Sequence, residues 1–180
     1  MRIARIAGVA GPVAFVGAWA VSGAVTDGYS PARDAISDLA ALGAPTRPWM
    51  TAGMVAFGVA MPVFARLLPR PAARAAIAAG VGTLAVAALP LDPGTEVPAH
   101  AVAAGASYLA LAGVPAFAGN APVALAALGL LGASVVVDGA SGLLQRAGLT
   151  LVDVWIVQRA LRPCPAPEGM PRQRRVDHVL

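Results

Sequence analysis

Long runs without a charged residue alternate with short polar segments along this chain. The first run, residues 6–26, follows two arginines and is long enough to cross a bilayer, which takes about 20 apolar residues in a helix. Similar runs predict further spans at about 48–65, 75–91, 100–118, 122–137 and 141–161. A cleavable signal peptide is the alternative interpretation of the first run. The pattern predicts an all-α integral membrane protein, with a bundle of six transmembrane helices formed by residues 1–163.

The most polar segment connects the first two spans, at residues 26–49. Ser30 and Pro31 are typical of a helix start, and Gly43 with Pro45 is typical of a stop. Between them apolar residues recur at helical spacing, namely Ala32, Ala35, Ile36, Leu39 and Leu42. The opposite face carries Asp34, Ser37 and Asp38. We therefore expect a short amphipathic helix in the first outer loop, lying over the mouth of the bundle.

The last span is the least apolar. Arg146, Thr150 and Asp153 are spaced i, i+4 and i+7, so they share one helix face, which should turn into the bundle because a charged face is costly in lipid. Asp38 and Asp138 are the carboxylates that we expect to pair with Arg146. Asp153 lies about 10 Å further along the helix and needs another partner, such as Ser107 or Thr150, or a proton.

Composition agrees with a membrane protein. Charged residues make up 12% of the chain, against about 25% in soluble domains. The 13 basic residues are all arginines, which with abundant alanine, glycine and proline suggests a GC-rich bacterial source. The single cysteine, Cys164, excludes an internal disulfide and a cysteine-based zinc cluster. The net charge of +4 does not indicate nucleic acid, because the arginines cluster where membrane topology requires them.

Arginine placement predicts the orientation. With six spans, three arginines fall on one side (Arg33, Arg47 and Arg146) and the other ten on the side of both termini. The positive-inside rule then places both termini in the cytoplasm of a bacterium, with the protein in its plasma membrane. Residues 164–180, which are basic and rich in proline, are expected to form a disordered cytoplasmic tail.

Several polar residues should meet at the outer face. The candidate ligand-binding residues are Asp38, His100, Arg146 and Asp153. A hydrolase or transferase would use Ser37 as nucleophile and His100 as base, oriented by Asp38 or Asp92. We expect no bound metal. The alternative is a carboxylate-rich cation site formed by Asp34, Asp38, Asp92 and His100. No cofactor is expected, and a bis-histidine haem is excluded because only His100 lies near a span.

Three segments carry a resemblance to a known family: YSPARDAISDLAALGAPTRPWM at 29–50, LPLDPGTEVPAHAVAAGASYLALAG at 89–113, and GLLQRAGLTLVDVWIVQRALR at 142–162. The chain resembles the small bacterial integral membrane proteins grouped as domain of unknown function 998. The ISDL core at 36–39 is the most specific part of the resemblance. It implies six spans and no established activity.

The leading functional hypothesis is a membrane protein without enzymatic activity that binds or moves a small amphiphile or lipid at the outer leaflet. A hydrolase with the Ser/Asp/His site and a structural or accessory subunit are the alternatives. Expected partners are membrane lipids, a small amphiphilic ligand, and a second copy or another membrane protein, but no nucleic acid.

Overall fold

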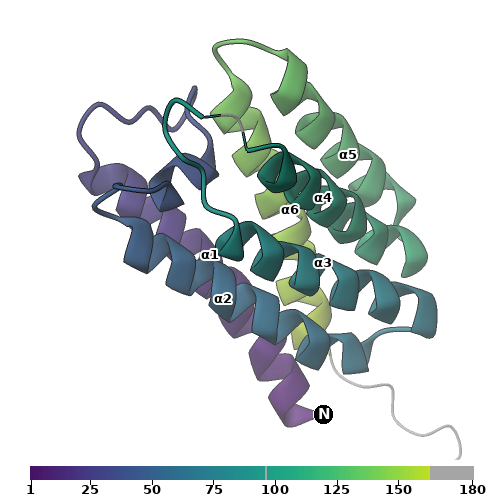
Figure 1. The fold of residues 1–180 in the computed structure, drawn as a ribbon. Coiled ribbons are helices and arrows are strands. Elements are labelled where there is room, and N and C mark those ends of the chain that lie inside the picture. The colour runs from purple at the N-terminus through teal and green to yellow at the C-terminus, as the bar shows by residue number, and fades with distance from the viewer. Residues whose placement is uncertain (96, 163–180) are drawn as a thin grey trace, which may run out of the picture.

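The computed structural model describes residues 1–95 and 97–162 (Figure 1). The described chain is all-helical and contains no β-strand. Six α-helices follow one another: α1 (Arg2–Val25), α2 (Arg47–Phe64), α3 (Arg70–Ala88), α4 (Pro98–Phe117), α5 (Ala121–Val136) and α6 (Ser141–Leu161). Two short 3₁₀ helices lie between them, η1 (Ile36–Ala40) and η2 (Ala65–Leu67). The tail at 164–180, expected to be disordered, lies outside the described residues.

The helices form a closed ring in chain order. Each helix packs on the next one in the chain, and α1 packs on α6, which closes the ring (Figure 1). The start of α1 and the end of α6 lie on the same side of the bundle, where a guanidinium nitrogen of Arg5 donates to the carbonyl oxygen of Arg162 over 3.0 Å. Ring packing leaves the centre of the bundle to side chains that point inward from all six helices.

Glycines let the helices approach closely at several contacts. A Cβ atom on Gly8 would lie 2.5 Å from the Phe64 ring and 2.8 Å from Ala160, so α1 meets both α2 and α6 at this point. On the α2–α3 contact, a Cβ on Gly80 would lie 2.6 Å from the carbonyl oxygen of Gly58. Small residues at helix contacts are typical of membrane bundles, where close backbone packing stabilises the association.

The outer surface of the ring identifies a membrane protein. Helices α1, α3 and α4, together with α2 extended through η2, are long and apolar enough to cross a membrane. Large apolar side chains are exposed around the ring, among them Val13, Val59, Val81, Leu109 and Leu125. A soluble monomer rarely exposes apolar surface on this scale, whereas lipid covers it without cost.

The start of the third helix differs from the sequence prediction. The segment 66–74, which connects the second and third predicted spans, is divided between η2 and the start of α3, which begins at Arg70 instead of near residue 75. Pro71 stands in that first turn, where its missing N–H costs nothing because no helical acceptor precedes it. The helix can therefore begin among the arginines.

The expected amphipathic α-helix in the first outer loop is not formed. We call residues 26–46 the cap segment. It contains a turn at 31–34 and then only the five residues of η1, separated by Ala35 in an extended conformation (ψ 153°). The Asp38 carboxylate accepts from the Ala35 N–H over 2.9 Å, so this donor is not available to a helix that continues from Pro31. Side chains of the cap segment and of α6 thus replace the helical hydrogen bonds that the periodicity predicts.

Candidate functional site

Arg146 on α6 anchors the cap segment. One terminal nitrogen of its guanidinium donates to the carbonyl oxygens of Pro31 (2.7 Å), Asp34 (2.9 Å) and Gly142 (2.9 Å), and the other donates to the Tyr29 hydroxyl. The side chain is buried. A cation in the second turn of a helix stands near the positive end of the helix dipole, so it needs negative partners close by. Here backbone carbonyl oxygens supply them.

Two aromatic rings enclose the same guanidinium. The rings of Trp19, on α1, and Tyr29 each have their centroid 5.4 Å from the guanidinium carbon of Arg146, within the range of a cation–π contact. Burial raises the pKa of Tyr29 above its ordinary value, so its hydroxyl keeps its proton and donates to the Ala35 carbonyl oxygen over 3.0 Å. Arginine, two rings and the cap backbone thus form one interlocked cluster.

The expected ion pair of Arg146 with Asp38 or Asp138 is not formed. The guanidinium donors go to carbonyl oxygens and Tyr29, as described above, and the Asp38 carboxylate caps η1 by accepting from Ala35. The Asp38 side chain reaches solvent, but its carboxyl group is partly buried, and this burial raises its pKa. The hydrogen bond from the Ala35 N–H acts in the opposite direction and lowers that pKa. The prediction failed because it considered only charged partners, whereas main-chain carbonyl oxygens accept from the guanidinium of Arg146.

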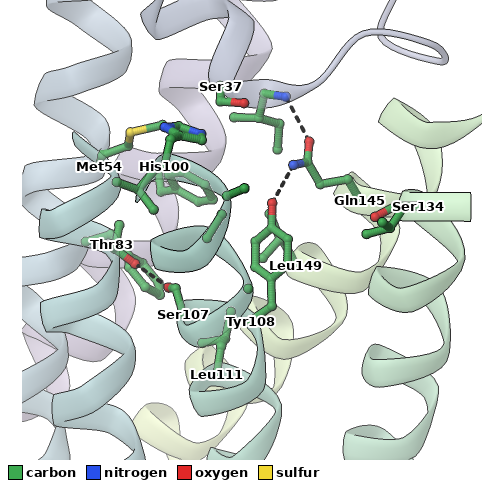
Figure 2. A pocket seen from close by; sticks show the side chains of 18 of the residues that line it. Ser37, Met54, Thr83, His100, Ser107, Tyr108, Leu111, Ser134, Gln145 and Leu149 are labelled. Carbon is green, nitrogen blue, oxygen red and sulfur yellow. Dashed lines mark hydrogen bonds between the residues drawn. The ribbon is translucent and has the colours of Figure 1, made fainter. Parts of the chain in front are cut away.

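A cavity of about 330 Å³ lies inside the ring, below the cap segment (Figure 2). All six helices and η1 contribute to its wall. The apolar lining includes Phe15, Met54, Phe57, Leu111 and Leu149. The polar lining consists of Ser37, Thr83, His100, Ser107, Tyr108, Ser134, Gln145 and Asp153. A concave, mainly apolar space with a few polar groups is the usual form of a site for a small molecule.

The cavity reaches the outside of the protein between α4 and α5. Ala101 and Gly105 on α4 and Val135 on α5 line the cavity and are also exposed on the surface, Val135 to 78%. These residues stand in the first half of α4 and at the end of α5, which is the half of the bundle covered by the cap segment. The opening therefore faces sideways.

Gln145 connects the roof of the cavity to its wall. Its side-chain oxygen accepts from the Ile36 N–H of η1 over 2.8 Å, and its side-chain nitrogen donates to the Tyr108 hydroxyl on α4 (Figure 2). Ile36 itself is buried and lines the cavity. Through this one amide, the cap segment, α4 and α6 hold each other in register above the cavity.

His100 and Ser37 both line the upper part of the cavity (Figure 2). The Nδ1 atom of His100 lies 2.6 Å from the Leu89 carbonyl oxygen. A carbonyl only accepts, so Nδ1 carries a proton, and in the neutral imidazole Nε2 is left as an acceptor. Leu89 thus occupies the place where a hydrolase would use a carboxylate to orient its histidine, and among the described contacts no hydrogen bond joins His100 to Ser37.

Asp153 stands two turns below Gln145 on the same helix and is 3% exposed. It lines the cavity, and neither of its carboxylate oxygens has a hydrogen-bond partner within the described part of the chain. Ser107, one of the partners expected for it, lines the same cavity but bonds Thr83 and the Ala79 carbonyl instead. The carboxylate is therefore the unsatisfied polar group of the cavity.

The residues of the alternative cation site are not assembled. Asp34 accepts from the Ser30 N–H over 2.6 Å, and Asp92 lies in the α3–α4 connection, where its backbone pairs with Thr95. Neither lines the cavity that His100 lines. Within residues 1–95 and 97–162, no three histidine, cysteine or acidic side chains come together as metal ligands would.

Sequence reasoning missed four contributors to these two sites. Tyr29 and Trp19 flank Arg146, and Gln145 is held by the fourth, Tyr108. A usable signal for Gln145 was present, because it precedes Leu149 and Asp153 at intervals of four and therefore lies on a continuous inward stripe of α6. No comparable signal marks the tyrosines, since an aromatic residue near a membrane surface is common in any span.

Comparison with known proteins assigns the chain to a family. No curated protein and no solved structure matches the chain, but a family model matches residues 9–162, which cover both the Arg146 cluster and the central cavity. That model describes a protein of unknown function, DUF998. The chain therefore belongs to the family designated domain of unknown function 998.

Proposed function

We propose that this protein binds a small amphiphile in its central cavity, in the outer half of a bacterial plasma membrane that all six helices cross. The observation that carries the proposal is the sideways opening at Ala101, Gly105 and Val135, which joins a mainly apolar cavity to the lipid-facing surface. A molecule dissolved in the outer leaflet enters there without passing through water.

The composition of α5 and α6 supports six spans. Helix α5 is apolar and shorter than the other helices, with 16 residues, or about 24 Å at the usual rise. Helix α6 has 21 residues, and its low hydropathy comes from polar side chains that face the ring, since Arg146 and Asp153 are buried. The lipid meets Leu143 and Val154 on its outer face instead.

The orientation rests on the arginines. Arg66, Arg70 and Arg74 lie on the same side as both ends of the six-helix ring, while Arg33 and Arg47 lie on the side of the cap segment. The positive-inside rule places the arginine-rich side in the cytoplasm. The cap segment and the opening of the cavity then belong to the outer half of the membrane.

The arrangement favours binding over hydrolysis. A serine hydrolase needs a base in contact with its nucleophile and a group that orients the base. In the described structure His100 is oriented by a carbonyl, and the carboxylates Asp38 and Asp92 lie outside the cavity. The walls offer apolar contact and hydrogen-bond acceptors, which suit a ligand that is held and released unchanged.

A photoreactive probe tests the proposal. An octanol derivative with a diazirine in its chain, applied to the protein in phosphatidylcholine nanodiscs, should label cavity residues of α4 and α6, and excess octanol should suppress that labelling. Gly105→Phe should block it, since Gly105 has open space beside it at the mouth. Gly129→Phe is the matched control, an exposed glycine of α5 away from the cavity.

Labelling spread evenly over the lipid-facing surface, and insensitive to excess octanol, would count against the cavity as a binding site. Equal labelling in Gly105→Phe and Gly129→Phe would reject the opening between α4 and α5 as the entrance.

A further inference from the structure

Three hydroxyls of the cavity lining present acceptors. The Thr83 hydroxyl donates to the Ala79 carbonyl oxygen over 2.9 Å, the Ser107 hydroxyl approaches the same oxygen, and the Ser134 hydroxyl donates to Leu131 over 2.6 Å. A hydroxyl that donates its proton to a backbone carbonyl oxygen still offers its oxygen lone pairs. These three residues therefore present acceptors to the cavity.

Asp153 adds the strongest acceptor. Its carboxylate is buried and has no partner in the described structure. A carboxylate removed from water without a counter-charge or hydrogen bonds is costly by several kcal/mol, so it is kept where something binds it. The position of Asp153 on the cavity wall points to the contents of the cavity as that partner.

No described residue of the cavity wall carries a permanent positive charge. Among the described residues the lining contains neither arginine nor lysine, and a neutral His100 presents the acceptor Nε2 because Nδ1 donates to Leu89. The nearest arginine on the same helix, Arg146, lies about 10 Å along the axis from Asp153, and its terminal nitrogens hold the cap segment. Where Asp153 is ionised, its counter-charge therefore comes from the ligand.

Aromatic rings favour the same class of ligand. Phe15 and Phe57 line the cavity with their centroids 5.5 Å apart, and Tyr108 lines it from α4. The faces of such rings attract an organic cation, and the remaining apolar wall accommodates a hydrocarbon body.

We infer that the ligand of the cavity is a primary ammonium compound with an apolar chain or ring, whose ammonium group binds the Asp153 carboxylate and the hydroxyl oxygens of Thr83 and Ser107. This inference rests on the proposed function and specifies it.

Three ligands of equal chain length test the charge. Octylammonium, octanol and octanoate are titrated into protein in phosphatidylcholine nanodiscs by calorimetry, with empty nanodiscs subtracted. Wild-type protein should bind octylammonium at least about tenfold more tightly than octanol, because a hydrogen bond to a charged group is worth about 1.5–3 kcal/mol. Octanoate should bind more weakly than octanol, since Asp153 repels it.

Two variants locate the preference. Asp153→Asn should bind octylammonium and octanol about equally while its affinity for octanol is kept. Asp138→Asn is the matched control, an exposed acid on the same side of the bundle, and should keep the wild-type preference. Thr83→Val preserves the shape of Thr83 and removes its acceptor, so it should reduce the preference by about fivefold. Thr83→Val and the wild-type ranking decide the matter even where Asp153→Asn does not fold.

The outcomes separate the two proposals. If octanol binds and Gly105→Phe blocks it, but octylammonium binds no better than octanol, the ammonium inference is wrong and the amphiphile site remains. This is also the result expected of an Asp153 that is neutralised by a proton. If none of the three ligands binds, the proposed function itself is overturned.

Discussion

The guanidinium carbon of Arg146 lies 5.4 Å from the centre of the Trp19 ring, and this contact joins the last helix to the first. Arg146 also holds the cap segment through the carbonyl oxygens of Pro31 and Asp34. Closure of the ring and placement of the cap segment therefore depend on the same side chain.

Replacement of Arg146 by lysine should be costly although the charge is kept. An ammonium group cannot lie flat between Trp19 and Tyr29, and it loses the planar fork that serves several acceptors. We expect a loss of about 2–4 kcal/mol in the free energy of unfolding, measured in mixed detergent micelles. Arg33→Lys, an exposed arginine of the same cap segment, should change it by less than about 0.5 kcal/mol. Equal effects of the two variants would contradict the anchoring role.

Gly142 should not tolerate a methyl group. A Cβ atom there would lie 2.3 Å from the Asp34 carbonyl oxygen and 2.8 Å from that of Pro31. Gly142→Ala should therefore displace the cap segment and cost about 1–3 kcal/mol, detectable as faster hydrogen exchange at residues 35–40. Gly129→Ala, in open space on α5, should be neutral or stabilising by up to about 1 kcal/mol. Unchanged exchange in Gly142→Ala would show that the contact relaxes freely.

Asp38 and Arg146 should behave independently. Breaking a buried ion pair costs about 3–5 kcal/mol and gives strong coupling between the two single changes. Because Asp38 caps η1 and Arg146 holds carbonyl oxygens of the same segment, the changes Asp38→Asn and Arg146→Gln should show a coupling energy of about 1 kcal/mol or less in a double-mutant cycle, well below that of a buried ion pair. A coupling energy of several kcal/mol would restore the ion pair.

The pH dependence of stability gives a second test of Asp38. Burial is the main reason that the pKa of Asp38 is raised in the folded protein. The neutral carboxyl group therefore contributes stability to the fold below its ordinary pKa of about 4, and this contribution is lost as the pH rises through the raised pKa. Asparagine does not titrate. The thermal midpoint of Asp38→Asn should therefore gain on that of the wild type as the pH rises above about 4. The opposite trend would mean that the charged form is the stabilised one.

Reporter fusions test the orientation. Fusions after Arg74 and after Arg162 should report cytoplasm, and insertions at residues 40–44 or at Gly94 should report the outside, because the arginine-rich connections stay on the cytoplasmic side. A cytoplasmic signal from the cap segment would invert the model and would move the cavity to the inner leaflet.

The first five helices could be predicted from the sequence because each contains a long charge-free run whose length and composition act locally. The cap segment could not, because its conformation depends on Gln145 and Arg146, which are more than a hundred positions away and take up its backbone groups. For Asp153, helical spacing predicted an inward position. It could not predict that Ser107 bonds its neighbours on α3 instead of the Asp153 carboxylate. Periodicity shows which way a side chain faces and leaves open what it meets there.

The ring of helices also fixes an order of events during synthesis. Because each helix packs on its chain neighbour, α1 to α5 can associate one after another as they leave the ribosome and enter the membrane. The wall between α5 and α1 stays open until α6 arrives with Gln145, Arg146 and Asp153. The final helix thus closes the ring, fastens the cap segment and delivers the carboxylate in a single step. A chain interrupted before residue 141 would therefore keep the cap segment without its anchors Gln145 and Arg146, and it would lack Asp153.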